Sequence, residues 1–282
     1  MPLPRLRRTL QSPSSRLEGI GLHSGVRVSV QVWPAPPGTG LMFRDAQTGQ
    51  EAPALAVNVQ DTSRCTRLGV GGMSVQTVEH LLSALAGLGI DDAVLETRGG
   101  EIPILDGSAA PFVVALRAAG LCDQAREPSV AGLRPTRPLL IEGAGGSVIA
   151  LKPSDVFSAA VFLDYPRHAY LGTLCTHFDA AADDYAADIA PARTFGFLTE
   201  VEALRARGLA LGASRENAVA LGDDDYETPL RFPDELARHK LLDLIGDLAL
   251  LGQPLRAEIF AIKPSHTLNI RLARALSDEG AS

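Results

Sequence analysis

Three of the six histidines lie beside carboxylates in the segments Thr77-Val78-Glu79-His80, residues 239–247 and Lys263-Pro264-Ser265-His266. If residues 239–247 form a helix, His239, Asp243 and Asp247 recur every fourth position and make one polar stripe. The other positions are mostly apolar, as in a helix packed into a core. A neutral imidazole and a carboxylate one turn apart are a common zinc ligand pair, although a solvated hydrogen bond explains such a pair equally well.

A zinc site made of His80, His239 and Asp243 would support hydrolysis. Three protein ligands leave a fourth position for water, which is typical of catalytic zinc sites. Zinc lowers the pKa of such a water from about 15.7 to roughly 7, and a carboxylate that is not a ligand can take the remaining proton. Glu79 is the predicted base, and a favourable anion in a first helical turn is its simpler interpretation. Iron also suits these ligands.

Hydrolysis of an amide needs an acid as well, because the nitrogen leaves only after it is protonated. We predict His266 in this role, with Asp247 holding its imidazole and favouring the imidazolium. A surface histidine and a locally paired aspartate are the alternatives for these two residues.

The elements expected in the first half alternate strands and helices. Alternating valines predict a strand over residues 26–32, with residues 41–43 returning as its hairpin partner. A helix is expected from about Thr77, as its cap, to Ala86, followed by a strand over residues 92–97. A loop over residues 101–108 then leads to a second helix capped by Ser108.

The second half repeats this pattern of strands before helices. Strands are expected over residues 139–141, 147–152, 157–164 and 256–262, and helices over residues 199–207 and 233–251. Three prolines between residues 123 and 138 place a domain boundary near residue 130, which divides the chain into domains 1–129 and 130–282. We therefore predict a pseudo-duplicated α+β fold.

Composition excludes several classes of protein. A hydrophobic fraction of 46% and a charged fraction of 21% are those of a folded globular chain. A net charge of −7 without a basic block argues against a nucleic-acid partner. Three scattered cysteines indicate a reducing cytoplasm, and no apolar run is long enough for a transmembrane segment. Arg5, Arg7 and Arg8 leave open a weak peripheral membrane contact, although a solvated cluster is the simpler interpretation.

Several motifs in order resemble one known family over nearly the whole chain. The chain is similar to UDP-3-O-acyl-N-acetylglucosamine deacetylase, a zinc amidase of lipid A biosynthesis. The resemblance begins at residues 19–25 and extends to the segment around His266. Its anchors are Thr77-Val78-Glu79-His80, residues 101–112, residues 192–197 and residues 238–247. The resemblance implies zinc on His80, His239 and Asp243, with Glu79 as base, His266 as acid and Asp247 as its partner.

The resemblance also implies further site residues. Thr194 would donate to a developing oxyanion, and Cys65 would lie near the site in a first insert. Substrate contacts are expected for Lys240 and Lys263 with the diphosphate or sugar, and for Tyr165 with the uracil. A second insert, about residues 195–225, would form an apolar passage for an acyl chain, with Phe195 and Phe197 among its lining. The implied fold is two α+β domains whose helices are sandwiched between two outer sheets.

Two other functions compete with this one. One is a deacetylase of a different N-acetylated sugar nucleotide, and the other is a zinc-binding protein without catalysis. The joint presence of Glu79, His266, Asp247 and Thr194 argues against a pure binder, which needs none of them. Pro264-Ser265 stands where the family often has a small Ser-Gly pair, which puts the closure of this loop on the sugar in question.

Overall fold

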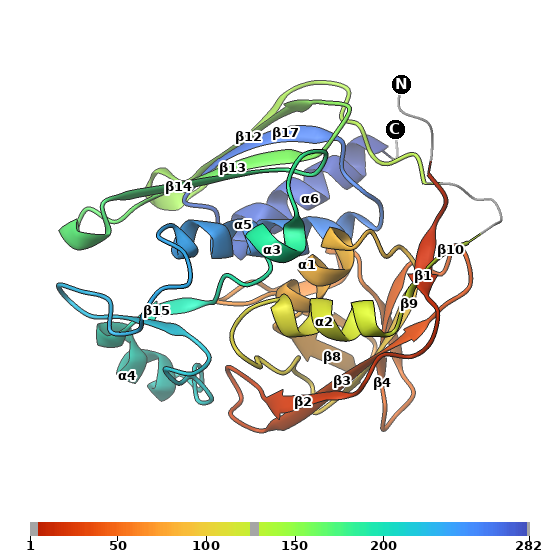
Figure 1. Cartoon of the computed structure of the whole chain (residues 1–282), viewed down its shortest axis with the longest axis horizontal. Coiled ribbons are helices and arrows are strands. Elements are labelled where there is room, and N and C mark those ends of the chain that lie inside the picture. The colour runs from red at the N-terminus through yellow and green to blue at the C-terminus, as the bar shows by residue number, and fades with distance from the viewer. Residues whose placement is uncertain (1–4, 125–129, 281–282) are drawn as a thin grey trace.

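The computed structural model describes residues 5–124 and 130–280. Two five-stranded sheets form the outer layers, and the main helices lie between them (Figure 1). The predicted α+β class is confirmed, with helices between two sheets.

The first sheet is built from strands of the first half of the chain. Its strands are β2 (Leu17–Ile20), β3 (Arg27–Pro34), β4 (Leu41–Asp45), β5 (Glu51–Pro53) and β9 (Ala93–Arg98), in the order β2-β3-β9-β4-β5. Strand β9 is antiparallel to β3 and parallel to β4. The predicted hairpin of residues 41–43 with residues 26–32 is therefore wrong. A later strand separates the two, and this pairing is not visible in the local sequence.

The second sheet has the same topology. Its strands are β11 (Leu139–Glu142), β12 (Val148–Pro153), β13 (Ser158–Asp164), β14 (Thr173–Asp179) and β17 (Ala257–Ile262), in the order β11-β12-β17-β13-β14. Here β17 is antiparallel to β12 and parallel to β13. In the first sheet, β9 is likewise antiparallel to β3 and parallel to β4. Alternate residues of β17, such as Ile259, point inward and are buried.

Each half adds one helix before its central strand and one after it. These helices are α1 (Glu79–Gly87) and α2 (Ala110–Ala118) in the first half, and α5 (Glu235–Leu248) and α6 (His266–Gly280) in the second. Apolar side chains of α1, α5 and both sheets form one core cluster. Their burial from water drives the two halves together. Helix α6 is not among the predicted elements.

An additional segment precedes α1 in one half and α5 in the other. The first insert contains η1 (Ala56–Asn58), β6 (Val59–Asp61), β7 (Arg67–Val70) and β8 (Met73–Gln76). The second insert contains β15 (Phe195–Phe197), α4 (Leu198–Ala206) and β16 (Val219–Leu221). Just before it, α3 (Tyr185–Asp188) rests on α1, where the Tyr185 hydroxyl donates to Ser83 Oγ at 2.8 Å.

The N-terminal arginines form ion pairs within the first half. Arg5 binds Asp91 and Arg7 binds Asp92, both at 2.6 Å, and Arg8 binds Asp123 at 2.8 Å, next to the β1 (Arg8–Leu10) and β10 (Leu121–Asp123) pair. A peripheral membrane contact through them stays a prediction. No helix within residues 5–124 and 130–280 has the length and hydrophobicity needed to cross a bilayer. The predicted boundary near residue 130 adjoins residues 125–129, which lie outside the described residues, and it also stays a prediction.

Candidate active site

The start of α1 places Glu79 and His80 at the seam between the two halves. Thr77 does not cap this helix as predicted. It adopts a left-handed conformation with φ of 59°, and its hydroxyl donates to Glu101 Oε1 at 3.1 Å. The Glu101 carboxylate is fully buried and also accepts the backbone N–H groups of His23 and Ser24. A non-local contact therefore fixes the turn from which α1 begins.

Helix α5 presents the predicted stripe of His239, Asp243 and Asp247 toward α1. All three residues are at most 2% exposed. Gly246 lies where the two helices come closest, because a Cβ there would collide with the carbonyl oxygen of Glu79. A glycine is required at this crossing.

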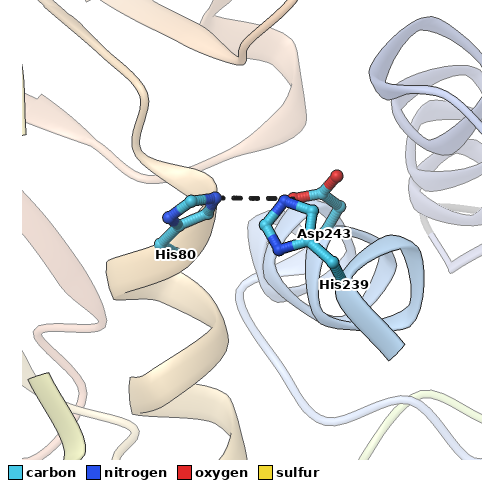
Figure 2. Close-up of side chains that lie close together, drawn as sticks. All are labelled: His80, His239 and Asp243. Carbon is cyan, nitrogen blue, oxygen red and sulfur yellow. Dashed lines mark ion pairs between the residues drawn. The ribbon is translucent and has the colours of Figure 1, made fainter. Parts of the chain in front are cut away.

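Three potential metal ligands converge from the two helices. The ligand atoms of His80, His239 and Asp243 all lie within 4.8 Å of one another. Asp243 Oδ1 is 3.7 Å from His80 Nε2 and 3.4 Å from His239 Nε2. Figure 2 shows His80 reaching across from α1 toward the pair on α5. The rings of the two histidines are nearly perpendicular, with centroids 5.0 Å apart.

The chemistry of these three groups fits a divalent cation. Asp243 Oδ1 is buried and has no hydrogen-bond partner among the described residues, an arrangement that is costly without a ligand. Hydrogen bonding between His239 Nδ1 and the Ala192 carbonyl, at 3.1 Å, leaves Nε2 free to coordinate. Burial, with the neighbouring His239, lowers the pKa of His80 to about 3, so it stays in the neutral form that binds metals. Two imidazoles and one carboxylate suit zinc.

Glu79 lies beside this cluster without belonging to it. Its Oε2 accepts the backbone N–H of Thr66 at 3.1 Å, and its Oε1 is 3.7 Å from His266 Nε2. Burial raises the pKa of Glu79 to about 7, and the nearby Asp247 and Asp243 add to this effect. A carboxylate with this pKa can both accept and release a proton near neutral pH.

His266, at the first position of α6, faces the same space from the other side. Its Nδ1 contacts Asp247 Oδ2 at 2.9 Å, while its Nε2 is 3.9 Å from Asp243 Oδ2. Burial favours the neutral ring, but Asp247, Glu79 and Asp243 outweigh it and raise the pKa of His266 to about 9. The imidazolium is therefore the form present at neutral pH.

Comparison with known proteins shows the family of the chain. A family model described as UDP-3-O-acyl N-acetylglycosamine deacetylase matches residues 7–278. The chain belongs to this deacetylase family. A Myxococcus xanthus protein named UDP-3-O-acyl-N-acetylglucosamine deacetylase is 42% identical over 276 residues, covering 96% of this chain and 86% of that protein. An Acidithiobacillus ferrooxidans protein of the same name is 46% identical over 266 residues, covering 92% and 86%. The family predicted from the motifs is confirmed.

An aromatic group adjoins the ligand cluster in this member of the deacetylase family. Tyr165 lies edge-on to Phe195 and Phe197, with ring centroids 6.4 Å and 5.6 Å away, and Phe195 is 6.1 Å from His239. Lys240 Nζ lies 5.6 Å from the centre of the Phe195 ring and donates to Asp243 Oδ2 at 2.8 Å. Four of the predicted substrate contacts are thus contiguous with the cluster.

The remaining predicted residues differ in their surroundings. Lys263 lies just after β17, where its Nζ is 3.8 Å from Asp164 Oδ2 in a partly exposed ion pair. Cys65 is only 4% exposed, and burial raises the pKa of its thiol to about 12, so the thiol is neutral. Thr194 has a fixed main chain, because its N–H donates to Gly107 O and its carbonyl accepts from Val219 N, both at 2.8 Å. The roles of these residues stay predictions.

Two buried residues outside the predicted set hold Asp247, the partner of His266. Thr66 Oγ1 donates to Asp247 Oδ1 at 2.6 Å, and Asn269 Nδ2 donates to Asp247 Oδ2 at 2.8 Å. Asn269 follows His266 by about one helical turn, so a predicted helix over residues 266–280 would have placed the two side chains on the same face. Thr66 carries no such signal, because its partner lies 181 positions away.

Proposed function

We propose that this protein is a zinc-dependent amidohydrolase that removes the N-acetyl group of UDP-3-O-(3-hydroxyacyl)-N-acetylglucosamine and releases acetate. This reaction would be the committed step of lipid A biosynthesis, in the cytoplasm. The observation that carries the proposal is the buried His80, His239 and Asp243 cluster, with one unpartnered carboxylate oxygen, directly beside Glu79 and His266. Membership of the deacetylase family supports the substrate class.

His80, His239 and Asp243 would hold the zinc ion. When bound, the ion would act as a Lewis acid that polarises the acetamide carbonyl and makes water more acidic. Lys240 donates to the second oxygen of Asp243, so that oxygen is already occupied and Oδ1 is directed at the cluster.

Glu79 would act as general base. It takes a proton from the attacking water as the new carbon–oxygen bond forms, and its pKa of about 7 suits this task at neutral pH. Thr66 holds one carboxylate oxygen, so the other, Oε1, remains on the side of His266. The Thr194 hydroxyl would donate to the oxygen that becomes negative in the tetrahedral intermediate.

His266 would act as general acid. As the carbon–nitrogen bond breaks, its Nε2 donates a proton to the departing amine, and the products are acetate and the acylated sugar nucleotide with a free amino group. Asp247 keeps Nδ1 engaged, which orients Nε2 toward the reaction space, and Thr66 and Asn269 hold Asp247 in turn. The substrate would contact Lys240, Lys263 and the aromatic group of Tyr165, Phe195 and Phe197, and its acyl chain would lie along the insert of residues 195–225.

The test is mass spectrometry of zinc-loaded protein incubated with the acylated sugar nucleotide, which should lose one acetyl group. The matched controls are His266→Ala and the same nucleotide without its acyl chain. Turnover that falls sharply in His266→Ala supports both the reaction and the acid. Equal turnover of the unacylated nucleotide would indicate a different substrate, and no turnover by zinc-loaded protein would contradict the proposal.

A further inference from the structure

A buried ion pair outside the reacting groups joins the start of α5 to the segment before β15. The Arg193 and Glu235 side chains are 9% and 0% exposed, and neither has a role in the proposed chemistry. Glu235 accepts four N–H groups. They come from the Arg193 backbone at 3.0 Å, Arg193 Nε at 2.8 Å, a terminal Arg193 nitrogen at 3.1 Å and the Arg231 backbone at 2.6 Å.

This carboxylate holds a backbone segment rather than a single side chain. Arg193 also donates to the Pro229 carbonyl at 2.7 Å. The Arg231 guanidinium donates to the Pro191 carbonyl at 2.8 Å and to Asp106 Oδ2 at 2.9 Å, which ties the same segment to a loop of the first half. Residues 191–193 are therefore fixed in position by both halves.

The residues on either side of Arg193 reach the active site. Before it, the Ala192 carbonyl bonds to Nδ1 of the metal ligand His239. After it, Thr194 follows, the proposed oxyanion donor. Glu235 precedes His239 by four residues, one turn earlier on the same face of α5. The Glu235 carboxylate, through Arg193, thus holds the Ala192 carbonyl at a fixed distance from His239.

We propose that Glu235 is a positioning residue, which acts through Arg193 to hold the Ala192 carbonyl against His239 and to place Thr194. The alternative is a buried ion pair that contributes only to folding. Such pairs are frequently neutral in stability compared with apolar replacements, whereas partners that orient a metal-binding histidine change metal affinity roughly 10–100-fold. Metal affinity therefore separates the two explanations. The inference rests on the proposed zinc site.

The chain offers a matched control for this test. Asp92 is fully buried, pairs with Arg7 through two guanidinium nitrogens and accepts the Gly40 N–H, so these partners all lie in the first half. Asp92→Asn removes a comparable buried charge without touching residues 191–194. Glu235→Gln is the test variant, and Arg193→Lys is the second one, which keeps the charge but loses the forked contact.

The experiment is a chelator competition that measures zinc affinity of the full-length protein, with thermal unfolding and kcat at saturating zinc measured in parallel. We expect both test variants to bind zinc roughly 10–100-fold more weakly, with a lower kcat and an altered visible spectrum of the cobalt-substituted protein. Asp92→Asn should lose thermal stability only. If Glu235→Gln does not fold, the zinc affinity of Arg193→Lys tests the inference.

Test variants that lose stability but keep the zinc affinity and cobalt spectrum of the wild type would overturn the inference alone. A wild-type protein that binds no zinc tightly would overturn the metal site, and the inference with it. The two failures are thus distinguishable.

Discussion

The two halves share one topology but contribute unequally to the site. In each, two hairpins flank a central strand, with one helix before this strand and one after it. The first half supplies Glu79 and His80 from the start of α1. The second supplies His239, Asp243 and Asp247 from α5, and His266 from the start of α6. Helix α2, the counterpart of α6, begins with Ala110 and Pro111. The repeated fold thus brings the starts of α1 and α6 to one face of α5, whose side chains complete the candidate site.

The largest effect on activity should come from removing Asp243, which lies between His80 of the first half and His239 of the second. Asp243→Ala removes the carboxylate between the two histidines, and we expect loss of tightly bound zinc and, with it, of nearly all activity. Glu79→Ala should keep the zinc and lose roughly 10²–10⁴-fold in rate. Metal analysis and initial rates check both variants. Equal zinc in Asp243→Ala and wild type would show that the ligand assignment is wrong.

The pH dependence tests whether the base comes from the first half and the acid from the second. Glu79 must be ionised to accept a proton, so the rate should rise as the pH passes its pKa of about 7. His266 must be protonated to donate, so the rate should fall above its pKa of about 9. His266→Ala should lower the rate roughly 10²–10⁴-fold and abolish the basic limb of the profile. A basic limb that persists in this variant would eliminate His266 as the acid.

The packing between the halves can be tested at Gly246. Gly246→Ala places a methyl group against the Glu79 carbonyl, so α1 and α5 must separate. We expect the free energy of unfolding to fall by about 3 kcal/mol, at the upper end for overpacking. Denaturant unfolding measures it. Gly196→Ala is the control, because an added Cβ there meets no atom within 4 Å. A wild-type midpoint for Gly246→Ala would mean that the helices can move apart without cost.

The smallest effect is expected in the second insert, whose aromatic side chains lie beside the site. Phe197 packs edge-on against Tyr165 and lies outside the ligand cluster. Phe197→Ala should raise KM for the acylated substrate about tenfold, equivalent to ~1.4 kcal/mol of binding, and leave kcat nearly unchanged. Phe162→Ala, a 38% exposed phenylalanine elsewhere, should change neither constant. A fall in kcat with constant KM would place Phe197 in the chemistry instead.

Sequence periodicity predicted what is local in this molecule. The stripe of His239, Asp243 and Asp247 was predictable because a spacing of four on an apolar helix has one geometric outcome. The conformation of Thr77 was not, because its partner Glu101 lies 24 positions away. The partner of β4 was missed for the same reason. The contact between His266 and Asp247 followed from chemical need and family resemblance, since spacing alone cannot bring two helices together.

The contact of Tyr185 with α1 contributes to the axial register of that helix. Tyr185 lies over Gly87, where any side chain would meet its ring, and bonds to Ser83 one turn beyond Glu79. Sliding α1 by a single residue would shift it by about 1.5 Å and turn it by roughly 100°. His80 would then point away from α5. The contact of Tyr185 with the C-terminal part of α1 thereby helps to keep His80, at the N-terminal end, facing α5.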